Sequence, residues 1–172
     1  YNKVEYEIKF SDLIRYCKPP FLAEQFIEGR EFNVAILGNE KPEVLPISEI
    51  DFSEMPYYLE NIVSYQAKWE PLNEAYHKTI PVCPADLSKK IEDRIKEIAL
   101  KCYEVMDLRD YARIDIRMTP GNELFVLEIN PNPDITEGVG FMRSAEAGGY
   151  SYSDILELLI DYALKRKKVE LR

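Results

Sequence analysis

The chain of 172 residues is predicted to fold as one α+β domain, with helices packed on an antiparallel sheet. Two runs of alternating apolar and polar residues flank a Pro-Gly turn at 119–122, which is typical of a β-hairpin. Two other segments, 87–106 and 151–164, carry apolar residues at helical spacing. Hydrophobic residues form 46% of the chain, which is sufficient for one real core.

The first half of the chain holds the other strand candidates. Residues 21–27 and 31–37 are bounded by proline or glycine, and 44–50 is a third candidate. Residues 51–84 contain Pro, Tyr and Asn without a sustained period, so they predict a long loop. The only histidine, His77, lies in that loop, where a surface position is favoured over a role as ligand or base.

The two helices are predicted from their apolar stripes. The stripe of the first helix consists of Ile91, Ile95, Ile98, Ala99, Cys102 and Met106. The stripe of the last helix consists of Ile155, Leu158, Leu159, Tyr162 and Ala163. Ser151 and Asp154 have the spacing of a capping box at the start of the last helix. Both stripes are expected to pack in the core and not to bind a cofactor.

Composition argues against several classes of protein. A net charge of −9 disfavours nucleic acid as a partner, and the basic cluster 165–168 is expected to complement the dipole of a helix end. No apolar run approaches the roughly 20 residues that span a bilayer, so no membrane partner is expected. The three well-separated cysteines argue against zinc and disulfides and fit a reducing cytoplasm.

The hairpin carries most of the polar chemistry. A turn that pairs Thr119 with Asn122 makes the opposed pairs Ile116–Phe125, Asp115–Val126 and Arg113–Glu128. In that register one face shows Arg113, Asp115, Glu128 and Asn130. The other face is a predicted core face of Ile114, Ile116, Phe125, Leu127 and Ile129. A three-residue loop would instead place the two polar sets on opposite faces.

Two interpretations of the polar face stay open on these residues alone. The first is a solvated sheet face with a cross-strand salt bridge between Arg113 and Glu128. The second is a site for a hard cation, because Mg²⁺ takes carboxylate oxygens together with phosphates and water. Asp115, Glu128 and Asn130 would supply oxygen ligands, and Arg113 would neutralise phosphate charge.

The pattern R-x-D, a turn, and then E-x-N-x-x-P resembles the metal-binding signature of the ATP-grasp ligases, most closely the D-alanine–D-alanine ligase branch. The upstream segment FLAEQFIEGREFNVAILG and the tail AGGYSYSDILELLIDYAL are similar to the same family. The resemblance implies the carboxyl-terminal half of an ATP-grasp fold with a lid-like loop at 51–84. It also implies that 1–172 is a partial domain, inactive by itself, because the family's amino-terminal domain and two upstream lysines have no counterpart, and the first residue is Tyr1.

The resemblance implies a role for several residues. The adenine hinge would consist of Glu24, Gln25, Phe26 and Ile27. Glu31 would bind the ribose hydroxyls, Leu127 would lie under the adenine and Lys68 would reach the γ-phosphate. Two Mg²⁺ ions (with Mn²⁺ as an alternative) would be held by Asp115 with Glu128 and by Glu128 with Asn130. Arg113 would stabilise the transferred phosphoryl group.

The implied reaction is a ligation: ATP activates a carboxylate as an acyl phosphate, and an amine displaces the phosphate. The implied setting is cytoplasmic synthesis of a peptidoglycan precursor, with small amino acid or peptide substrates and a homodimer as a candidate assembly. Asp134 and Val139 stand where the family has Gly and Ser, and Trp69 stands where a tyrosine is usual. A ligase for another amino acid or peptide, and a nucleotide-binding module without ligase activity, are the alternatives.

Overall fold

The computed structural model describes the backbone of residues 3–170 and the side chains of residues 3–166. The strands are β1 (Arg30–Leu37), β2 (Glu43–Val44), β3 (Ser48–Asp51), β4 (Ile80–Val82), β5 (Tyr111–Met118) and β6 (Leu124–Asn130). They form one antiparallel sheet in the order β4-β3-β1-β5-β6, with β2 paired to the end of β1. The antiparallel α+β architecture predicted from the sequence is confirmed.

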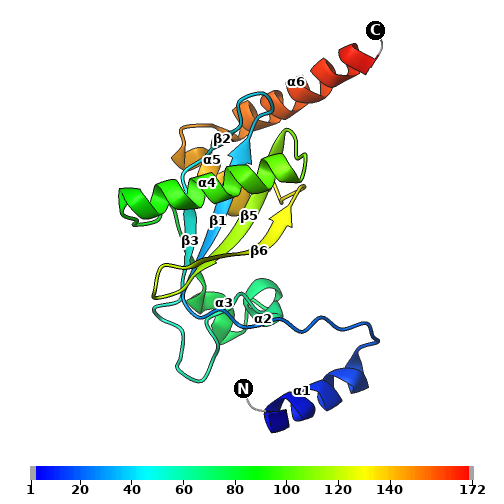
Figure 1. Cartoon of the computed structure of the whole chain (residues 1–172), viewed down its shortest axis with the longest axis vertical. Coiled ribbons are helices and arrows are strands. Elements are labelled where there is room, and N and C mark those ends of the chain that lie inside the picture. The colour runs from blue at the N-terminus through cyan, green and yellow to red at the C-terminus, as the bar shows by residue number, and fades with distance from the viewer. Residues whose placement is uncertain (1–2, 171–172) are drawn as a thin grey trace.

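Helices cover both faces of this sheet (Figure 1). They are α1 (Lys3–Tyr16), α2 (Tyr65–Trp69), α3 (Glu74–Lys78), α4 (Lys89–Val105), α5 (Gly140–Ala147) and α6 (Tyr152–Glu170). The α4 helix crosses one face, while α5 and the start of α6 lie behind the other, and α1 lies apart from the sheet. No helix in the described part of the chain is long and apolar enough to cross a membrane.

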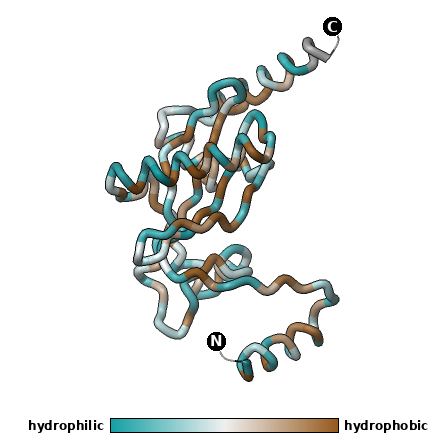
Figure 2. The backbone as a smooth tube through the Cα atoms, in the orientation of Figure 1, coloured by the Kyte–Doolittle hydropathy of each residue, from teal (hydrophilic) through white to brown (hydrophobic). Residues whose placement is uncertain are grey.

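Two apolar cores hold the layers together. The first lies between the sheet and α4, where Ile95, Ala99 and Tyr103 meet the buried side chains of β1 and β5. The second lies between the opposite sheet face and α5, with Phe141 at its centre. Figure 2 shows this distribution as brown along the central strands and alternating teal and brown along α4. Burial of these apolar side chains is the main source of stability.

The predicted helices form with small corrections at their ends. Met106 and Ala163 were expected in the core but are exposed, because Met106 follows the end of α4 and α6 continues beyond the sheet (Figure 1). Within the basic cluster 165–168, Arg166 forms an ion pair with Asp110, while the side chains of 167 and 168 lie outside the described residues. The α1 helix has no buried residue and was not predicted from the sequence.

The capping box at the start of α6 is confirmed. The Asp154 carboxylate accepts hydrogen bonds from the Ser151 backbone N–H at 2.8 Å and from its hydroxyl at 2.7 Å, while the Asp154 N–H donates to Ser151 Oγ. We therefore expect Ser151→Ala to lower the free energy of unfolding by about 1 kcal/mol in denaturant melts. Ser153→Ala, in the exposed first turn of the same helix, is the matched control and should stay within about 0.5 kcal/mol of wild type. Equal losses for both variants would contradict the cap.

The loops depart further from the predictions. Residues 21–27 form no strand, and the candidate 44–50 is divided into β2 and β3 by a short segment around Pro46, which has no backbone N–H for a sheet ladder. The segment 51–84 is not without regular structure, since it contains α2, α3 and β4. Ser64 and Asn73 cap the two short helices through their side-chain oxygens. This segment covers one end of the sheet (Figure 1).

The hairpin register differs from the predicted one in two ways that compensate. The loop has three residues, because the Thr119 N–H bonds to the Glu123 carbonyl and Asn122 adopts φ 64°. The predicted pairs Ile116–Phe125, Asp115–Val126 and Arg113–Glu128 are therefore wrong. A β-bulge then adds Leu127 to β6, and the observed pairs are Arg117–Phe125, Ile116–Val126, Asp115–Glu128 and Arg113–Asn130.

The bulge decides which side chains share a face. It restores the common face that the three-residue loop alone would have destroyed, so Asp115, Glu128, Arg113 and Asn130 do project together. Phe125 and Leu127 are not in the core as predicted. Phe125 is opposed to Arg117 and 39% exposed, and Leu127 is 47% exposed. The core face keeps Ile114 and Ile116, which are fully buried.

Candidate functional site

The polar face extends over three neighbouring strands. In the register of β1 and β5, Glu31 lies opposite Arg117 and Asn33 lies opposite Asp115. Since opposed residues share a face, these side chains join the polar set of the hairpin. Further along β1, Ala35 and Leu37 on the same face pack against α5. One end of this sheet face is thus apolar and covered by a helix, while the other end is polar.

A cavity of about 450 Å³ lies over the polar end. The sheet contributes Glu31, Asn33, Arg113, Asp115, Leu127 and Glu128 to its wall. The segment 51–84 contributes residues that include Val63, Lys68 and Tyr76, and the start of α5 contributes Gly140 and Arg143. The structure thus brings together six of the residues singled out in the sequence: Glu31, Lys68, Arg113, Asp115, Leu127 and Glu128.

Asp115 and Arg113 form a tight ion pair at the cavity wall. Arg113 Nε and Nη2 each donate to a different Asp115 oxygen at 2.7 Å, and Asn33 Nδ2 donates to Asp115 Oδ1 at 3.0 Å. Burial opposes the charge of Arg113, but the hydrogen bonds and the charges of Asp115, Glu128 and Glu31 raise its pKa above the ordinary value. In place of the cross-strand salt bridge between Arg113 and Glu128, which was one of the two interpretations of the polar face, Arg113 forms an ion pair with Asp115 within β5.

Glu31 is held in a partly desolvated position. Burial raises the pKa of Glu31, the positive charge of Arg117 lowers it, and the negative charge of Asp115 raises it. The net result is a pKa above the usual value. Arg117 Nε donates to Glu31 Oε2 at 3.2 Å. Arg117 and Asn33 were not among the site residues predicted from the sequence. Arg117 lies two residues after Asp115 and Asn33 lies two residues after Glu31, a spacing that places each pair on one face of its strand. Only the pairing of β1 with β5 shows that the two pairs lie on the same face of the sheet.

The predicted adenine hinge is only partly brought to the site. Glu24 and Gln25 are exposed in an extended segment and do not line the cavity. The Phe26 ring lies against the Arg117 guanidinium, with Cζ 5.0 Å from the ring centroid. The Ile27 carbonyl accepts a hydrogen bond from Arg117 Nη1. The segment thus reaches the sheet through residues 26 and 27.

Lys68 projects from α2 toward the same cavity. Its ammonium lies 5.5 Å from the centroid of the Trp69 ring.

Asp134 accepts a hydrogen bond from the Thr136 N–H at 2.8 Å. The hydrogen bonds from Thr136, together with the positive charges of Lys68 and Arg113, lower the pKa of Asp134. Val139 lines the cavity. The predicted surface position of His77 is confirmed, since its side chain is exposed.

The residues predicted to hold metal ions include an opposed pair of carboxylates. Among the side chains of residues 3–166, no group of three or more His, Cys, Asp and Glu is arranged to hold a metal ion. Asp115 and Glu128 are directly opposed across β5 and β6. Asn130 follows on the same face, and its Oδ1 accepts a hydrogen bond from the Asn132 N–H at 3.0 Å. This oxygen donor set fits Mg²⁺, which commonly takes one or two carboxylates and completes its shell with phosphates and water.

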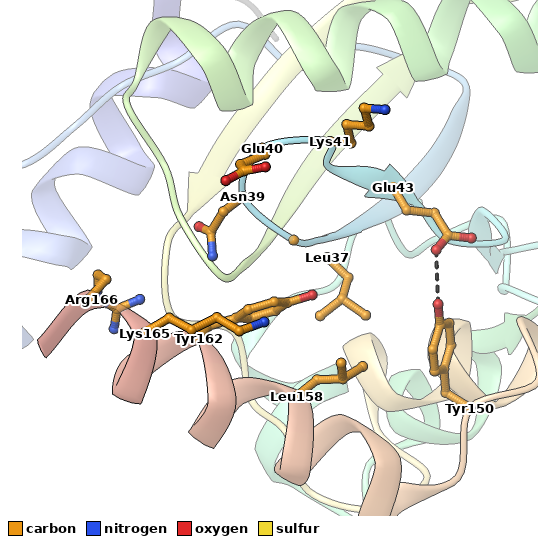
Figure 3. A pocket seen from close by; sticks show the side chains of 11 residues that line it. Leu37, Asn39, Glu40, Lys41, Glu43, Tyr150, Leu158, Tyr162, Lys165 and Arg166 are labelled. Atoms are coloured by element: carbon orange, nitrogen blue, oxygen red, sulfur yellow. Dashed lines mark hydrogen bonds between the residues drawn. The ribbon is translucent and has the colours of Figure 1, made fainter. Parts of the chain in front are cut away.

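A larger cavity of about 770 Å³ lies at the opposite end of the domain, between the β1–β2 turn and α6. Figure 3 shows Leu37 and Leu158 at its apolar floor and Tyr162 and Lys165 projecting from α6. Tyr150 closes one side by donating to Glu43 Oε2 at 2.9 Å. None of the residues predicted for the site lies there, so the cavity over the polar face is the candidate functional site.

Comparison with known proteins gives consistent matches. The family described as D-ala D-ala ligase C-terminus matches residues 2–161. The D-alanine–D-alanine ligase of Desulforudis audaxviator is 32% identical over 160 residues, which cover 93% of this chain and 48% of that protein. The D-alanine–D-alanine ligase structure from Bacillus anthracis, complexed with ATP, superposes with a TM-score of 0.70 at 23% identity, covering 99% of this chain and 50% of that one.

A second solved structure, the VanG D-Ala:D-Ser ligase from Enterococcus faecalis, has a TM-score of 0.60 at 26% identity and covers 81% of this chain and 37% of that one. The chain therefore spans about half, or less, of the length of the proteins it matches. The family match extends over nearly the whole chain, and the structural likeness confirms the antiparallel fold. By this match, the chain belongs to the family of D-ala D-ala ligase C-terminal domains.

Proposed function

We propose that the protein is an ATP-dependent ligase that joins a carboxylate to an amine, as D-alanine–D-alanine ligases do, and that residues 1–172 form part of its ATP-grasp domain. The observation that carries this proposal is the opposed pair Asp115–Glu128, beside Arg113 and facing Lys68 across one cavity. Two carboxylates and two cations in one cavity suit a metal–nucleotide complex, because the carboxylates hold cations and the cationic side chains bind phosphate.

The oxygen donors of β5 and β6 would hold the metal ions. Asp115 and Glu128 would bind one Mg²⁺ and Glu128 and Asn130 a second, with Mn²⁺ as an alternative ion. When bound, these ions neutralise phosphate charge. Both Asp115 oxygens accept hydrogen bonds from Arg113 in this structure, so these bonds must weaken when Asp115 binds a cation. The guanidinium of Arg113 is then free to donate to phosphate oxygens.

The other residues would position the nucleotide. Residues 24–27 would hold adenine through backbone groups, Leu127 would lie under the base and Glu31 would bind the ribose hydroxyls. Exposure of Leu127 at the cavity wall supports this role, because a core residue would be buried. Lys68 would bind the γ-phosphate from the segment 51–84. That segment covers the cavity and would exclude water from a hydrolysable intermediate.

The proposed reaction has two steps. A substrate carboxylate oxygen attacks the γ-phosphorus of ATP, and ADP leaves, which gives an acyl phosphate. An amine then attacks the acyl carbon, and the carbon–oxygen bond to phosphate breaks, so that an amide and inorganic phosphate form. Arg113 would offset the negative charge on the transferred phosphoryl group and on the tetrahedral species. The protein acts mainly by positioning and by charge stabilisation.

The first test is phosphate release by the natural full-length protein with Mg-ATP and a panel of amino acids. We expect D-alanine to stimulate release and a dipeptide to appear in the products. Stimulation by D-serine or another amino acid instead would keep the ligase and show that Asp134 and Val139 accompany a different substrate. ATP binding without stimulation by any amino acid or peptide would contradict the ligase and favour a nucleotide-binding module.

A further inference from the structure

The side chain of Arg117 is the most deeply buried charged group in the described chain, with 2% of its surface exposed. A buried cation is costly unless all its donors are satisfied. A guanidinium offers five N–H donors in a rigid fork, so one carboxylate cannot satisfy it. The acceptors around Arg117 therefore identify the segments of the fold that it connects.

Its donors reach three separate segments. Nε donates to Glu31 Oε2 on β1, Nη1 donates to the Ile27 carbonyl before β1, and Nη2 donates to the Asn61 carbonyl in the segment 51–84. The planar group also lies against two rings, with Cζ 5.0 Å from the centroid of Phe26 and 5.7 Å from that of Phe52. These cation–π contacts come from the same segments as the accepting carbonyls.

The placement of Arg117 on β5 links these contacts to the cavity. It lies two residues after Asp115 on the same face and directly opposite Glu31. Glu31 lines the cavity, whereas Arg117 lies behind it and is not part of the wall. Arg117 can therefore act on a bound nucleotide only through the groups it holds. A carboxylate fixed by one oxygen to a buried guanidinium has few rotamers left, and it is pre-organised to accept hydrogen bonds.

We propose that Arg117 is a positioning residue that holds the Glu31 carboxylate, the Ile27 carbonyl and the covering segment at Asn61 in one arrangement, and so sets recognition of the ribose hydroxyls. This inference rests on the proposed function, in which Glu31 binds ribose. A hydrogen bond from a hydroxyl to a charged acceptor contributes about 1.5–3 kcal/mol, which corresponds to about 10- to 100-fold in affinity. Loss of the arrangement should remove most of that preference.

The test compares ATP with 2′-deoxy-ATP and 3′-deoxy-ATP as substrates of the full-length protein. We expect wild type to prefer ATP over at least one deoxy analogue by about 10- to 100-fold in kcat/KM. Arg117→Met should reduce this preference to within about threefold, mainly through KM. In a double-mutant cycle with Glu31→Ala, Arg117→Met should have little further effect on the preference, because both changes remove the same contact.

Arg30→Met is the matched control. Arg30, like Arg117, pairs with a carboxylate and lies against an aromatic ring: it donates two hydrogen bonds to Glu49, each at 2.6 Å, and lies 5.1 Å from the centroid of the Phe32 ring. It is outside the cavity wall, so its loss should affect stability and leave the ribose preference unchanged.

Arg117→Lys keeps the charge and provides a second variant if Arg117→Met does not fold. A single ammonium cannot reproduce the fork that reaches three acceptors, so this variant should also lose the preference. Full preference for ATP in either folded variant would overturn the inference while the ligase activity stands. Absence of Mg-ATP turnover in wild type would instead overturn the proposed function itself, and the inference with it.

Discussion

Glu128→Gln is expected to lower Mg-ATP turnover of the full-length protein by about 1,000-fold. Glu128 lies opposite Asp115 across the hairpin, and in the proposed site it is the ligand shared by both metal ions. Glutamine keeps the size of the side chain but removes its negative charge, which a hard divalent cation requires. Phosphate release at saturating ATP and amino acid substrate measures the effect, and a second series at increasing Mg²⁺ and Mn²⁺ shows whether weakened metal binding is the cause.

Glu123→Gln is the matched control, because it makes the same chemical change on an exposed residue beside the hairpin loop. Its turnover should stay within about twofold of wild type, since surface substitutions away from a site change little. Turnover of Glu128→Gln within about threefold of wild type would refute the metal assignment. Thermal melts of both variants will test whether any loss of activity reflects a loss of fold.

Gly29→Ala is expected to have the largest effect on stability, with a loss of about 3 kcal/mol. Gly29 joins the segment 21–28 to β1 at φ 137°, where a side chain is strained. A Cβ added there would lie 2.0 Å from the Met118 carbonyl oxygen and 2.9 Å from its carbon. Both are backbone atoms of a central strand, so neither can move aside cheaply. Chemical denaturation of the full-length protein measures the loss.

Gly149→Ala separates strain from collision. Gly149 has φ 91°, which also disfavours a side chain, but a Cβ there would meet nothing within 4 Å. We expect this variant to lose about 1 kcal/mol, which is the conformational cost alone. Equal losses at the two positions would contradict a close approach of Gly29 to β5. Because Gly29 lies two residues after Ile27, whose carbonyl accepts a hydrogen bond from Arg117, Gly29→Ala should also raise KM for ATP, whereas Gly149→Ala should not.

The hairpin shows how far local patterns reach. Alternation on the two sides of 119–122 predicted two strands and the polar set on one face, and both are observed. The predicted register was wrong, because the loop closes with Asn122 in a left-handed conformation and adds one residue. The bulge at Leu127 adds a second extra residue, so the polar side chains of the two strands still share a face. Neither feature has a distinct signal in alternation, since a bulge changes pairing and not composition.

The sequence by itself determined the elements whose causes are local. These are the amphipathic α4, the capping box of α6, the strands of the hairpin and the cluster of carboxylates and arginine in the R-x-D and E-x-N signature. Short-range periodicity and side-chain chemistry are sufficient for each of them. The family resemblance predicted that Lys68 and Glu31 belong to the same site, and both residues line the cavity.

Only the tertiary structure decided which distant groups meet. The pairing of β1 with β5 places Glu31 against Arg117 and Asn33 against Asp115, over sequence separations of 86 and 82 residues. The tertiary structure also leaves Glu24 and Gln25 exposed and outside the cavity wall, and it makes Arg117 a buried link between three segments. Such contacts depend on strand order and register across the whole sheet, and no local window of sequence contains both partners.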